Sequence, residues 1–446
     1  MIAVDLELAG EGIKYCQLHT DLFSIQKTFP PIQRAGRFYL FHMENQYIVK
    51  QNKKLRLGFT TGSCCAAAAK AAAIMAFTGE NVNQVELMTP KGILLKLKVH
   101  DPKITKEYTS CKIQKDAGDD PDVTNQIYIH VRLEKCEKDQ HHAAQRIFRE
   151  QQTNHLGAVV YITGGNGVGV VTKPGLEQPV GSYAINKIPR KMIRDAVAEV
   201  CEEFDYCQGM LVSIEIPEGV KVAQKTFNQR LGIKGGISIL GTSGIVEPMS
   251  ESALIESIRS ELRVIKAQKK QYVVISPGNY GEQFIKNHLN FSLDQAVKCS
   301  NFIGLTIDAA VECGFDGILF VSHIGKFIKV AGGIMDTHSK NADARMELFA
   351  ANAAIAGAPL SLIQSILQST TTEEVIGKLK DEDMLLPTME QVMEKIHFYL
   401  KNRCGEALEI EALVFSNEYG ELGRTKHAEI LLDRIKNGGL SEKYER

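Results

Sequence analysis

An alanine run constrains the fold of this chain more than any other feature. Residues 58–77 read GFTTGSCCAAAAKAAAIMAF, with seven alanines interrupted by Lys70. Alanine is the strongest helix former, and the preceding hydroxyls suit an N-cap, so we expect a helix over Ala66–Phe77. Such small side chains let other backbone approach closely. The helix start is either a capped packing element or an anion-facing terminus, because free N–H groups carry partial positive charge.

Composition limits the class of protein. The chain has 446 residues, enough for two or three domains, and its net charge of −1 favours neither nucleic acid nor a membrane surface as partner. No uninterrupted apolar run is long enough to span a bilayer, and the N-terminus lacks the pattern of a signal peptide. Ten cysteines without a C-x-x-C pair indicate reduced thiols, so we expect a cytoplasmic protein.

The pattern divides the chain into four parts. Residues 1–53 show no sustained period and predict a loosely ordered extension, with an edge strand near Arg37–His42 as the alternative. Residues 54–268 mix strands with a few helices, which predicts an α+β domain. From 269 to 385 strands and helices alternate, which predicts a parallel sheet in an α/β domain, and 386–446 reads as a helix, a strand and a helix that complete the fold.

The expected elements can be stated by range. We expect helices at Ala66–Phe77, Arg190–Phe204, Glu251–Ala267, Glu282–His288, Gly304–Cys313, Asp343–Ala356, 361–380, 388–402 and 425–436. We expect strands at Gln84–Thr89, Leu94–Val99, Ile127–Leu133, Ala158–Thr163, Val168–Thr172, Leu211–Ile216, Tyr272–Ser276, Ala296–Asn301, 316–322 and Leu408–Phe415, and a turn at YGELG.

A glycine-rich stretch, YITGGNGVGVVTKPG at 161–175, superficially resembles a dinucleotide fingerprint. That fingerprint requires a helix after the loop, whereas here a second strand and Pro174 follow. A hairpin with a glycine-rich turn is therefore the preferred interpretation, and contact with a ligand stays open because glycine lets backbone approach closely.

An aspartate cluster occupies KDAGDDPDVTN at 115–125. Repulsion among these acids would raise some of their pKa values unless a cation or N–H donors offset it. The cluster is either a turn capped by aspartates or a functional site, and the spacing does not match a calcium loop. A functional site would supply a general base or associate with a cation, and for the first role we name Asp116 and Asp119 as candidates.

Three stretches are rich in cations and poor in acids: 173–194, 219–246 and 317–335. In a nearly neutral protein this segregation predicts a local positive field that attracts an anionic ligand. The alternative is a set of solvated faces that acids elsewhere in the fold balance. The cations in question are Lys173, Lys187, Arg190, Lys191, Arg194, Lys221, Lys225, Arg230, Lys234, Lys326 and Lys329.

The pattern predicts a cofactor loop in the second part of the chain. VVISPGNYGEQF reads as strand, glycine turn and helix, the arrangement in which an adenosine-bearing cofactor meets a parallel sheet. Beyond the third strand, residues 321–345 concentrate His323, His338 and other polar side chains. Two histidines fifteen residues apart without cysteines are weak support for zinc, so we expect hydrogen-bonding and acid/base roles and no metal site.

Seven ordered motifs give the chain a family resemblance. They are GFTTGSCCAAAAKAA, KDAGDDPDVT, GGNGVGVVTKPGL, AINKIPR, ILGTSGIVEPMSE, SNFIG and HIGKFIKVAGGIMDTHSKNADAR. In this order they resemble the CbiD family, the cobalt-precorrin-5B C1-methyltransferases of anaerobic cobalamin biosynthesis, over about residues 54–435. Departures are Cys65, Gln126 and the unmatched first 42 residues. We carry over no catalytic residues from the family.

The resemblance implies methyl transfer from S-adenosylmethionine to carbon 1 of a cobalt-containing tetrapyrrole that bears several carboxylates. It also implies a Rossmann-like second domain at 269–385, which we expect to bind the cofactor, while 54–268 binds substrate. The metal arrives inside the ring, so the protein need hold none. We expect neither nucleic acid nor membrane as partner, and leave open a homodimer or transient contacts with neighbouring pathway enzymes.

On this basis we assign candidate roles. Candidate catalytic residues are Asp116, Asp119, His323 and His338. Candidate cofactor contacts are Ser276, Gly278, Asn279, Gly281, Ser300 and Asn301. Candidate substrate contacts are Thr61, Ser63, Lys70, Lys173, Arg190, Lys234, Thr242, Ser243, Lys326 and Arg345. A non-catalytic tetrapyrrole carrier is the alternative function; a phosphotransferase is disfavoured because no G-x-x-x-x-G-K-[ST] is present.

Overall fold

The computed structural model describes residues 41–42, 46–50, 52–140, 146–151, 157–289, 291 and 296–437. Most of the expected extension 1–53, including most of the alternative edge strand, lies outside these residues. Its described parts are β1 (Phe41–His42), β2 (Tyr47–Lys50) and the start of β3 (Lys53–Arg56). Strands β2 and β3 pair antiparallel.

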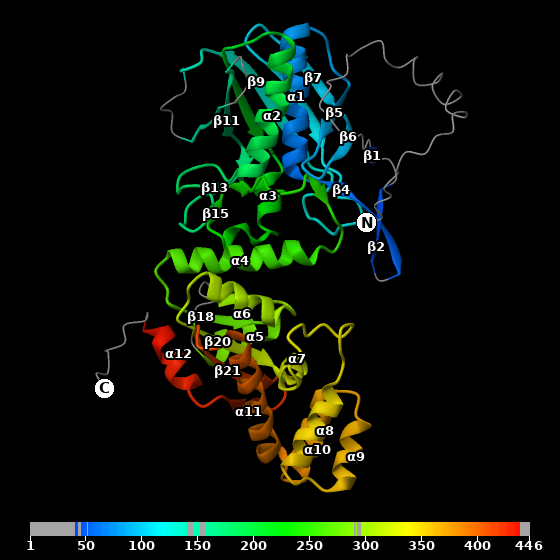
Figure 1. The fold of residues 1–446 in the computed structure, drawn as a ribbon, viewed down its shortest axis with the longest axis vertical. Helices are drawn as coiled ribbons and strands as arrows, with labels where there is room; N and C mark the ends of the chain where they lie inside the picture. Colours follow the sequence, from blue (N-terminus) through cyan, green and yellow to red (C-terminus); the bar gives the residue numbers. More distant parts are fainter. Residues whose placement is uncertain are drawn as a thin grey trace, which may run out of the picture. The chain divides into compact units, whose positions relative to one another are not determined.

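A mixed sheet of six strands organises the first half. Its order is β10-β11-β14-β9-β8-β7, in which β11 and β14 are parallel and the other pairs are antiparallel. Helices α1 and α2 pack against each other on one face of this sheet (Figure 1). The elements are α1 (Thr61–Thr78), β7 (His100–Ile104), β8 (Thr109–Gln114), β9 (Tyr128–Cys136), β10 (Phe148–Gln151), β11 (Val159–Gly164), α2 (Lys187–Glu203) and β14 (Gly209–Glu215).

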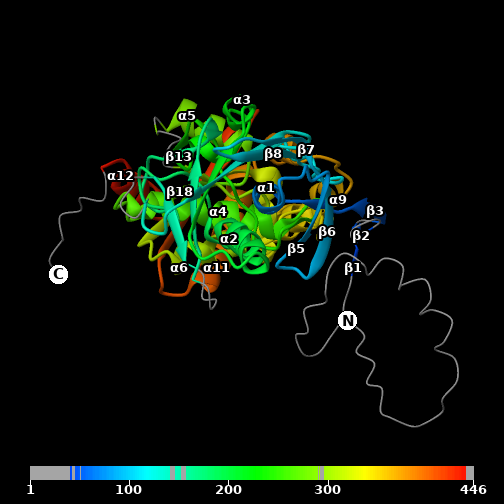
Figure 2. The same ribbon diagram turned by 90° about the horizontal axis from the view of Figure 1, so that it is seen from above.

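The alanine run forms α1, which confirms the predicted helix and starts it five residues earlier, at Thr61. Side chains of β8 reach the helix backbone: Thr109 Oγ1 donates to Ala72 O at 2.7 Å, and Cys111 Sγ lies 3.3 Å from Ala68 O. Only methyl groups cover the helix here, so strand and helix approach closely. Viewed from above, α1 lies among β8, β5 (Gln84–Met88) and α2, all of which it contacts (Figure 2).

Helix α1 is long and apolar enough to cross a membrane by length and composition, the one such helix in the part of the chain that the structure describes. However, 72% of that window is buried inside the protein. A buried helix of this kind belongs to the core, where the alanines pack against the sheet.

The glycine-rich stretch does not form the predicted hairpin. Strand β11, before the loop, pairs with β10 and β14, whereas the two short strands after the loop pair with later segments of the chain. These pairs are β12 (Gly167–Val168) with β16 (Gly236–Ile237) and β13 (Val170–Val171) with β15 (Ile233–Lys234). The hairpin prediction is wrong because the loop leaves the six-stranded sheet.

Close packing of backbone explains the glycines of this loop. A Cβ on Gly167, whose φ is +78°, would lie 1.7 Å from Ile216 O, and a Cβ on Gly236 would lie 2.1 Å from Gly167 O. A Cβ on Gly164 would lie 2.6 Å from the ring of Tyr183. The glycines therefore serve contacts within the chain.

The second half contains the predicted parallel sheet. Its order is β19-β18-β20-β21-β22, with β22 alone among these strands antiparallel to its neighbour. The strands are β18 (Tyr272–Ser276), β19 (Ala296–Lys298), β20 (Gly317–His323), β21 (Glu409–Ser416) and β22 (Gly420–Arg424). The expected turn at YGELG is mostly β22, because these residues pair with the end of β21.

Helices cover both faces of this sheet (Figure 1). Val273 and Ile275 belong to one hydrophobic cluster with α4, α6 and α11, while Val274 belongs to another with α5 and α12. This alternation follows the period of two in a strand. The helices are α4 (Glu251–Ala267), α5 (Asn279–His288), α6 (Ile303–Glu312), α11 (Leu385–Cys404) and α12 (Ala428–Lys436).

Shorter elements complete the described chain. They are β4 (Gly58–Phe59), β6 (Ile93–Lys98), α3 (Gly219–Ala223), η1 (Phe227–Gln229), β17 (Ile245–Val246), α7 (Ile324–Phe327), η3 (Ile328–Gly332), α8 (Arg345–Ile355), α9 (Leu360–Leu367) and α10 (Thr372–Asp381). The expected helix 361–380 is therefore two helices. Thr371 ends the connection between them by accepting the N–H of Glu374 at 3.2 Å as the N-cap of α10.

The packing of Gly236 generates a stability prediction. Gly236→Ala should lower the free energy of unfolding by more than about 2 kcal/mol, because the new methyl group meets backbone that cannot rotate away. Gly377→Ala in α10 is the control: its Cβ would meet only the hydroxyl of Tyr419, at 3.1 Å, and alanine favours a helix. Denaturant unfolding followed by circular dichroism measures both. Equal midpoints for Gly236→Ala and the parent would contradict the packing explanation.

Candidate functional site

The parallel sheet places two chain turns at one edge. Strand β18 neighbours β19 on one side and β20 on the other, so the connections after β18 and β20 diverge there. In open α/β sheets, ligands bind at the carboxyl ends of strands at such a point. The turn Pro277–Gly278 follows β18, and His323 ends β20. Lys326 Nζ donates to Pro277 O at 3.3 Å and thereby connects the two turns.

The glycines of the first turn have different environments. A Cβ on Gly281 would lie 1.9 Å from Ser276 Oγ and 2.8 Å from Val321 O, so Gly281 permits close packing of α5 on the sheet. Ser276 is buried and donates to Gly278 O at 3.0 Å. By contrast, a Cβ on Gly278 meets nothing within 4 Å. Gly278 therefore leaves open space at the start of α5, where Asn279 accepts from Lys298 Nζ.

A cavity of about 320 Å³ brings together residues from all three predicted groups. It contains the cofactor candidate Asn301, the substrate candidates Lys326 and Arg345, and the catalytic candidate His338. Its lining residues are Asn301, Gly325, Lys326, Lys329, Thr337, His338, Ser339 and Arg345. Ser300, with φ of +55°, precedes this wall. Three lining side chains are cationic, so the cavity suits an anion.

Backbone oxygens hold both lysines of the cavity, of which Lys329 is buried and Lys326 is half-buried. Lys329 is 2% exposed, and its Nζ donates to Ala342 O at 2.7 Å and to Thr337 O at 3.2 Å. Burial lowers the pKa of Lys329 and of Lys326, because the charged form loses water. From the sequence, Lys329 is one cation of a basic stretch and has no assigned role. The sequence pattern gives no signal for Thr337.

His338 presents a donor to the cavity. Its Nδ1 accepts the N–H of Lys340 at 3.1 Å, so the neutral ring carries its proton on Nε2. The backbone N–H of His338 in turn donates to Asp336 Oδ1 at 3.1 Å. This arrangement favours hydrogen bonding to an anion over removal of a proton.

Both ring nitrogens of His323 are engaged within the chain. Nδ1 accepts the N–H of Gly325 at 3.1 Å, and Nε2 lies 3.1 Å from Glu373 Oε1. Burial lowers the pKa of His323, although Glu373 opposes this effect. His323 thereby caps α7, the helix that carries Lys326. The ring can accept a proton only after one of these contacts is exchanged.

The aspartate cluster forms a structural junction. Asp116 holds Arg56 through two hydrogen bonds of 2.6 and 2.8 Å, and this contact holds the pKa of Asp116 below its ordinary value. Asp119 Oδ2 accepts the backbone N–H of Arg56 at 2.6 Å. Asp120 accepts from Met249 N at 2.9 Å, and Asp122 pairs with the buried Lys115. Cations and N–H donors thus offset the repulsion among the aspartates. This arrangement agrees with the interpretation of the cluster as a turn capped by aspartates.

Other chain segments occupy the start of α1. Ser63 is fully buried, and its hydroxyl donates to Gly244 O at 2.6 Å. The N–H of Gly62 points to Leu240 O at 3.4 Å, and Thr61 is 5% exposed. The loop that carries Thr242 and Ser243 therefore covers this helix terminus, with Thr242 itself exposed.

The remaining cationic candidates divide into two groups. Lys70 pairs with Glu199 of α2 at 2.9 Å. Arg190 lies 3.2 Å from Glu150 and 3.6 Å from Glu177. Lys173 and Lys234 form no ion pair within the described ranges, and Lys234 is exposed on β15. The structure does not bring these four into the cavity of Lys326.

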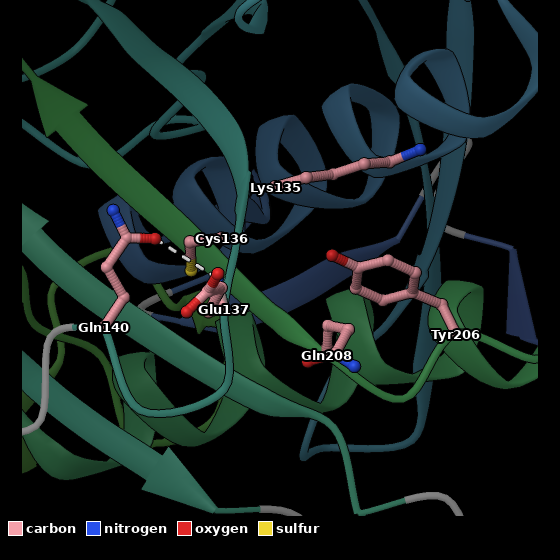
Figure 3. A pocket seen from close by; sticks show the side chains of 6 residues that line it. All are labelled: Lys135, Cys136, Glu137, Gln140, Tyr206 and Gln208. Carbon is pink, nitrogen blue, oxygen red and sulfur yellow. Dashed lines mark hydrogen bonds between the residues drawn. The ribbon is translucent and has the colours of Figure 1, made fainter.

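A second cavity, of about 290 Å³, lies beside the end of β9 (Figure 3). It is lined by Lys135, Cys136, Glu137, Gln140, Tyr206 and Gln208. Burial raises the pKa of the Cys136 thiol to about 11 and of the Tyr206 hydroxyl to about 12, so neither ionises near neutral pH.

Among the described residues, no group of three or more His, Cys, Asp and Glu could hold a metal ion.

The Arg56 junction yields a pH prediction. Asp116→Asn should lower the free energy of unfolding at pH 7 by about 1 kcal/mol, because a charge-assisted pair is lost whose side chains are partly exposed to water. The folded-state pKa of Asp116 is depressed, so its contribution is present above the unfolded-state pKa and disappears as pH falls through the folded-state value. The difference in urea unfolding between parent and variant should therefore narrow as the pH falls below the ordinary carboxyl pKa. Asp101→Asn, in an exposed pair with Lys112, should change little; a gap that stays constant as the solution is acidified would refute this account.

Comparison with known proteins identifies the family of the chain. Residues 48–248 match the family model described as CbiD, and 336–426 match the one described as the CbiD C-terminal domain. A protein of Ruminiclostridium cellulolyticum named cobalt-precorrin-5B C(1)-methyltransferase is 46% identical over 377 residues, covering 84% of this chain and 93% of the relative. A protein of the same name from Alkaliphilus metalliredigens is 44% identical and covers 89% and 99%.

One solved structure is also similar. It is the crystal structure of a cobalamin biosynthesis protein (cbiD) from Archaeoglobus fulgidus, 28% identical, covering 67% of this chain and 86% of that one, with a TM-score of 0.34. The sequence relatives are both more similar and more completely covered. On their identity and coverage, this chain belongs to the CbiD family.

Proposed function

We propose that this chain methylates carbon 1 of cobalt-precorrin-5B, with S-adenosylmethionine as donor and cobalt-precorrin-6A and S-adenosylhomocysteine as products. The observation that carries this proposal is 46% identity, over 84% of this chain and 93% of the relative, to a protein named for that reaction. The activity makes the chain an enzyme, a C-methyltransferase of cobalamin biosynthesis. A cytoplasmic location suits its small-molecule substrates.

We propose further that the second sheet is Rossmann-like and holds the methyl donor. The parallel order β19-β18-β20-β21 and the helices on both faces support this view. The open side of Gly278 and the neighbouring Asn279 and Asn301 provide the surface for an adenosine-bearing ligand. Helix α4 contributes to the core of this sheet, so the domain boundary that we placed after 268 is better proposed before Glu251.

Substrate recognition rests on charge. The tetrapyrrole bears several carboxylates, and we propose that exposed Lys234, Thr242 and the cations of the cavity receive some of them. Lys70 and Arg190 already pair with acids, so their proposed role is to fix helix packing. Ser63 and Thr61 support the loop over α1 and act on substrate only through it.

Positioning should supply most of the rate. The sulfonium methyl is already activated: the electron pair of the ring carbon forms the new C–C bond while the C–S pair leaves with sulfur. The enzyme must therefore hold donor and acceptor in line. His338 is placed to donate to an anion, while Asp116, Asp119 and His323 have partners within the chain. A proton-accepting role for any of these four residues stays a prediction.

Activity separates this proposal from a tetrapyrrole carrier. Purified protein with cobalt-precorrin-5B and S-adenosylmethionine should give a product that is one methyl group heavier and one equivalent of S-adenosylhomocysteine, measured by mass spectrometry. With methyl-labelled donor, the label should appear at carbon 1. A protein that binds the tetrapyrrole but never transfers the label would be a carrier.

The donor site is tested by Gly278→Val. The side chain would enter open space, so folding should be preserved, while it should block the start of α5 and weaken S-adenosylhomocysteine binding at least about tenfold. Isothermal titration calorimetry measures this affinity. Gly278 has an extended backbone with φ of −172°, which valine adopts without strain, so the melting temperature of Gly278→Val should match that of the parent. Unchanged affinity in Gly278→Val would exclude this turn as the donor site. Gly281→Val is uninformative because it would clash with Ser276.

A further inference from the structure

The cavity wall carries a hydroxyl that the chain itself does not use. Thr337 is 3% exposed and lines the 320 Å³ cavity. Its backbone is fully engaged, because its N–H donates to Asn301 O at 3.0 Å and its carbonyl accepts from Lys329 at 3.2 Å. Thr337 Oγ1, however, is buried without a hydrogen-bond partner among the described residues. An unpaired buried hydroxyl costs free energy, so its place in a cavity indicates a ligand that completes it.

The wall around this hydroxyl is positive and held in place. Arg345 directs Nε and Nη2 to Asp343 at 2.6 and 3.0 Å, which fixes its guanidinium at the rim. Asp336 is occupied by His338 N–H and by Asn341 Nδ2 at 2.7 Å. The lining contains three cations, Lys326, Lys329 and Arg345, against the two acids Asp336 and Asp343 beside it, and Lys329 Nζ lies 3.9 Å from Asp343.

We propose that this cavity binds one carboxylate group of a ligand, with Thr337 Oγ1, Arg345 and Lys326 as its principal donors. Arg345 offers Nη1, the guanidinium nitrogen that is not bonded to Asp343, Lys326 adds a point charge, and the threonine hydroxyl gains its missing partner. The cavity is at the small end of ligand sites, so it takes an arm and not a macrocycle. The inference rests on the proposed function, in which the donor carries one α-carboxylate and the tetrapyrrole carries several.

Two substitutions test the subsite, and the chain offers a matched control for each. Thr337→Val removes the hydroxyl and keeps the shape; Thr388 Oγ1 in α11 is likewise buried without a partner in the described chain, so Thr388→Val is its control. Arg345→Gln removes one charge from the cavity. Arg424 forks onto Glu421 at 2.6 and 2.8 Å as Arg345 does onto Asp343, so Arg424→Gln is the second control.

Calorimetry with three ligands distinguishes the two sources of the carboxylate. The ligands are S-adenosylhomocysteine, methylthioadenosine, which lacks the α-carboxylate, and uroporphyrin, a stable carboxylated tetrapyrrole. Arg345→Gln should weaken binding of the carboxylate ligand at least about tenfold and Thr337→Val about threefold or more, with both controls unchanged. A loss confined to S-adenosylhomocysteine assigns the donor carboxylate; a loss confined to uroporphyrin assigns a substrate arm. Methylthioadenosine affinity should not change.

The failure of this inference is distinct from the failure of the proposed function. If the parent binds both carboxylate ligands and neither cavity variant binds either one more weakly, the subsite does not exist, although the methyltransferase proposal stands. If the parent binds neither ligand, the proposed function fails. The subsite is then tested separately, with citrate as a small carboxylate ligand. Citrate should then raise the melting temperature of the parent and of Arg424→Gln but not of Arg345→Gln; equal shifts in all three would overturn the subsite.

Discussion

Close approach of backbone to backbone holds this fold together. The approach occurs where a side chain is a methyl group or is missing. Alanines on α1 let Thr109 and Cys111 of β8 hydrogen-bond to the helix backbone. Gly58 and Gly118 let two loops pass each other, since a Cβ on either would lie within 2.2 Å of backbone atoms of the other loop. These contacts leave no room for variation in size, because interiors are packed as densely as crystals.

Charge is arranged differently in the two halves of the chain. In the first half, acids and cations neutralise one another in pairs such as Arg56 with Asp116 and Lys70 with Glu199. In the second half, Lys326, Lys329 and Arg345 gather around one cavity, where backbone carbonyls accept from both lysines while Asp343 holds Arg345. A carbonyl satisfies an ammonium group without cancelling its charge. The positive field therefore survives where an anionic ligand can use it.

Much of the fold was predictable because its signals are local. Glu251–Ala267 forms α4 over the predicted range. The alternation of strands and helices from Tyr272 predicted the parallel strands β18, β19 and β20, although not their order in the sheet. The hairpin at Gly164–Gly169 was wrong because a glycine-rich loop is equally compatible with leaving its sheet, and the partner strand is more than sixty residues away. The site was predicted in part: Asn301, Lys326, His338 and Arg345 share one cavity, whereas Lys70 and Arg190 lie elsewhere.

The sequence by itself determined the alanine helix, the change from mixed to alternating pattern and the family of the chain, because residue type and order carry all three. Only the tertiary structure decided which charged side chains form ion pairs within the chain. Asp116 and Asp119 are candidate bases by sequence, and the structure shows that both accept from Arg56; Thr337 carries no signal in the sequence, and its hydroxyl is buried without a partner among the described residues. The pairing of a side chain depends on neighbours that are distant in sequence, and folding alone brings these together.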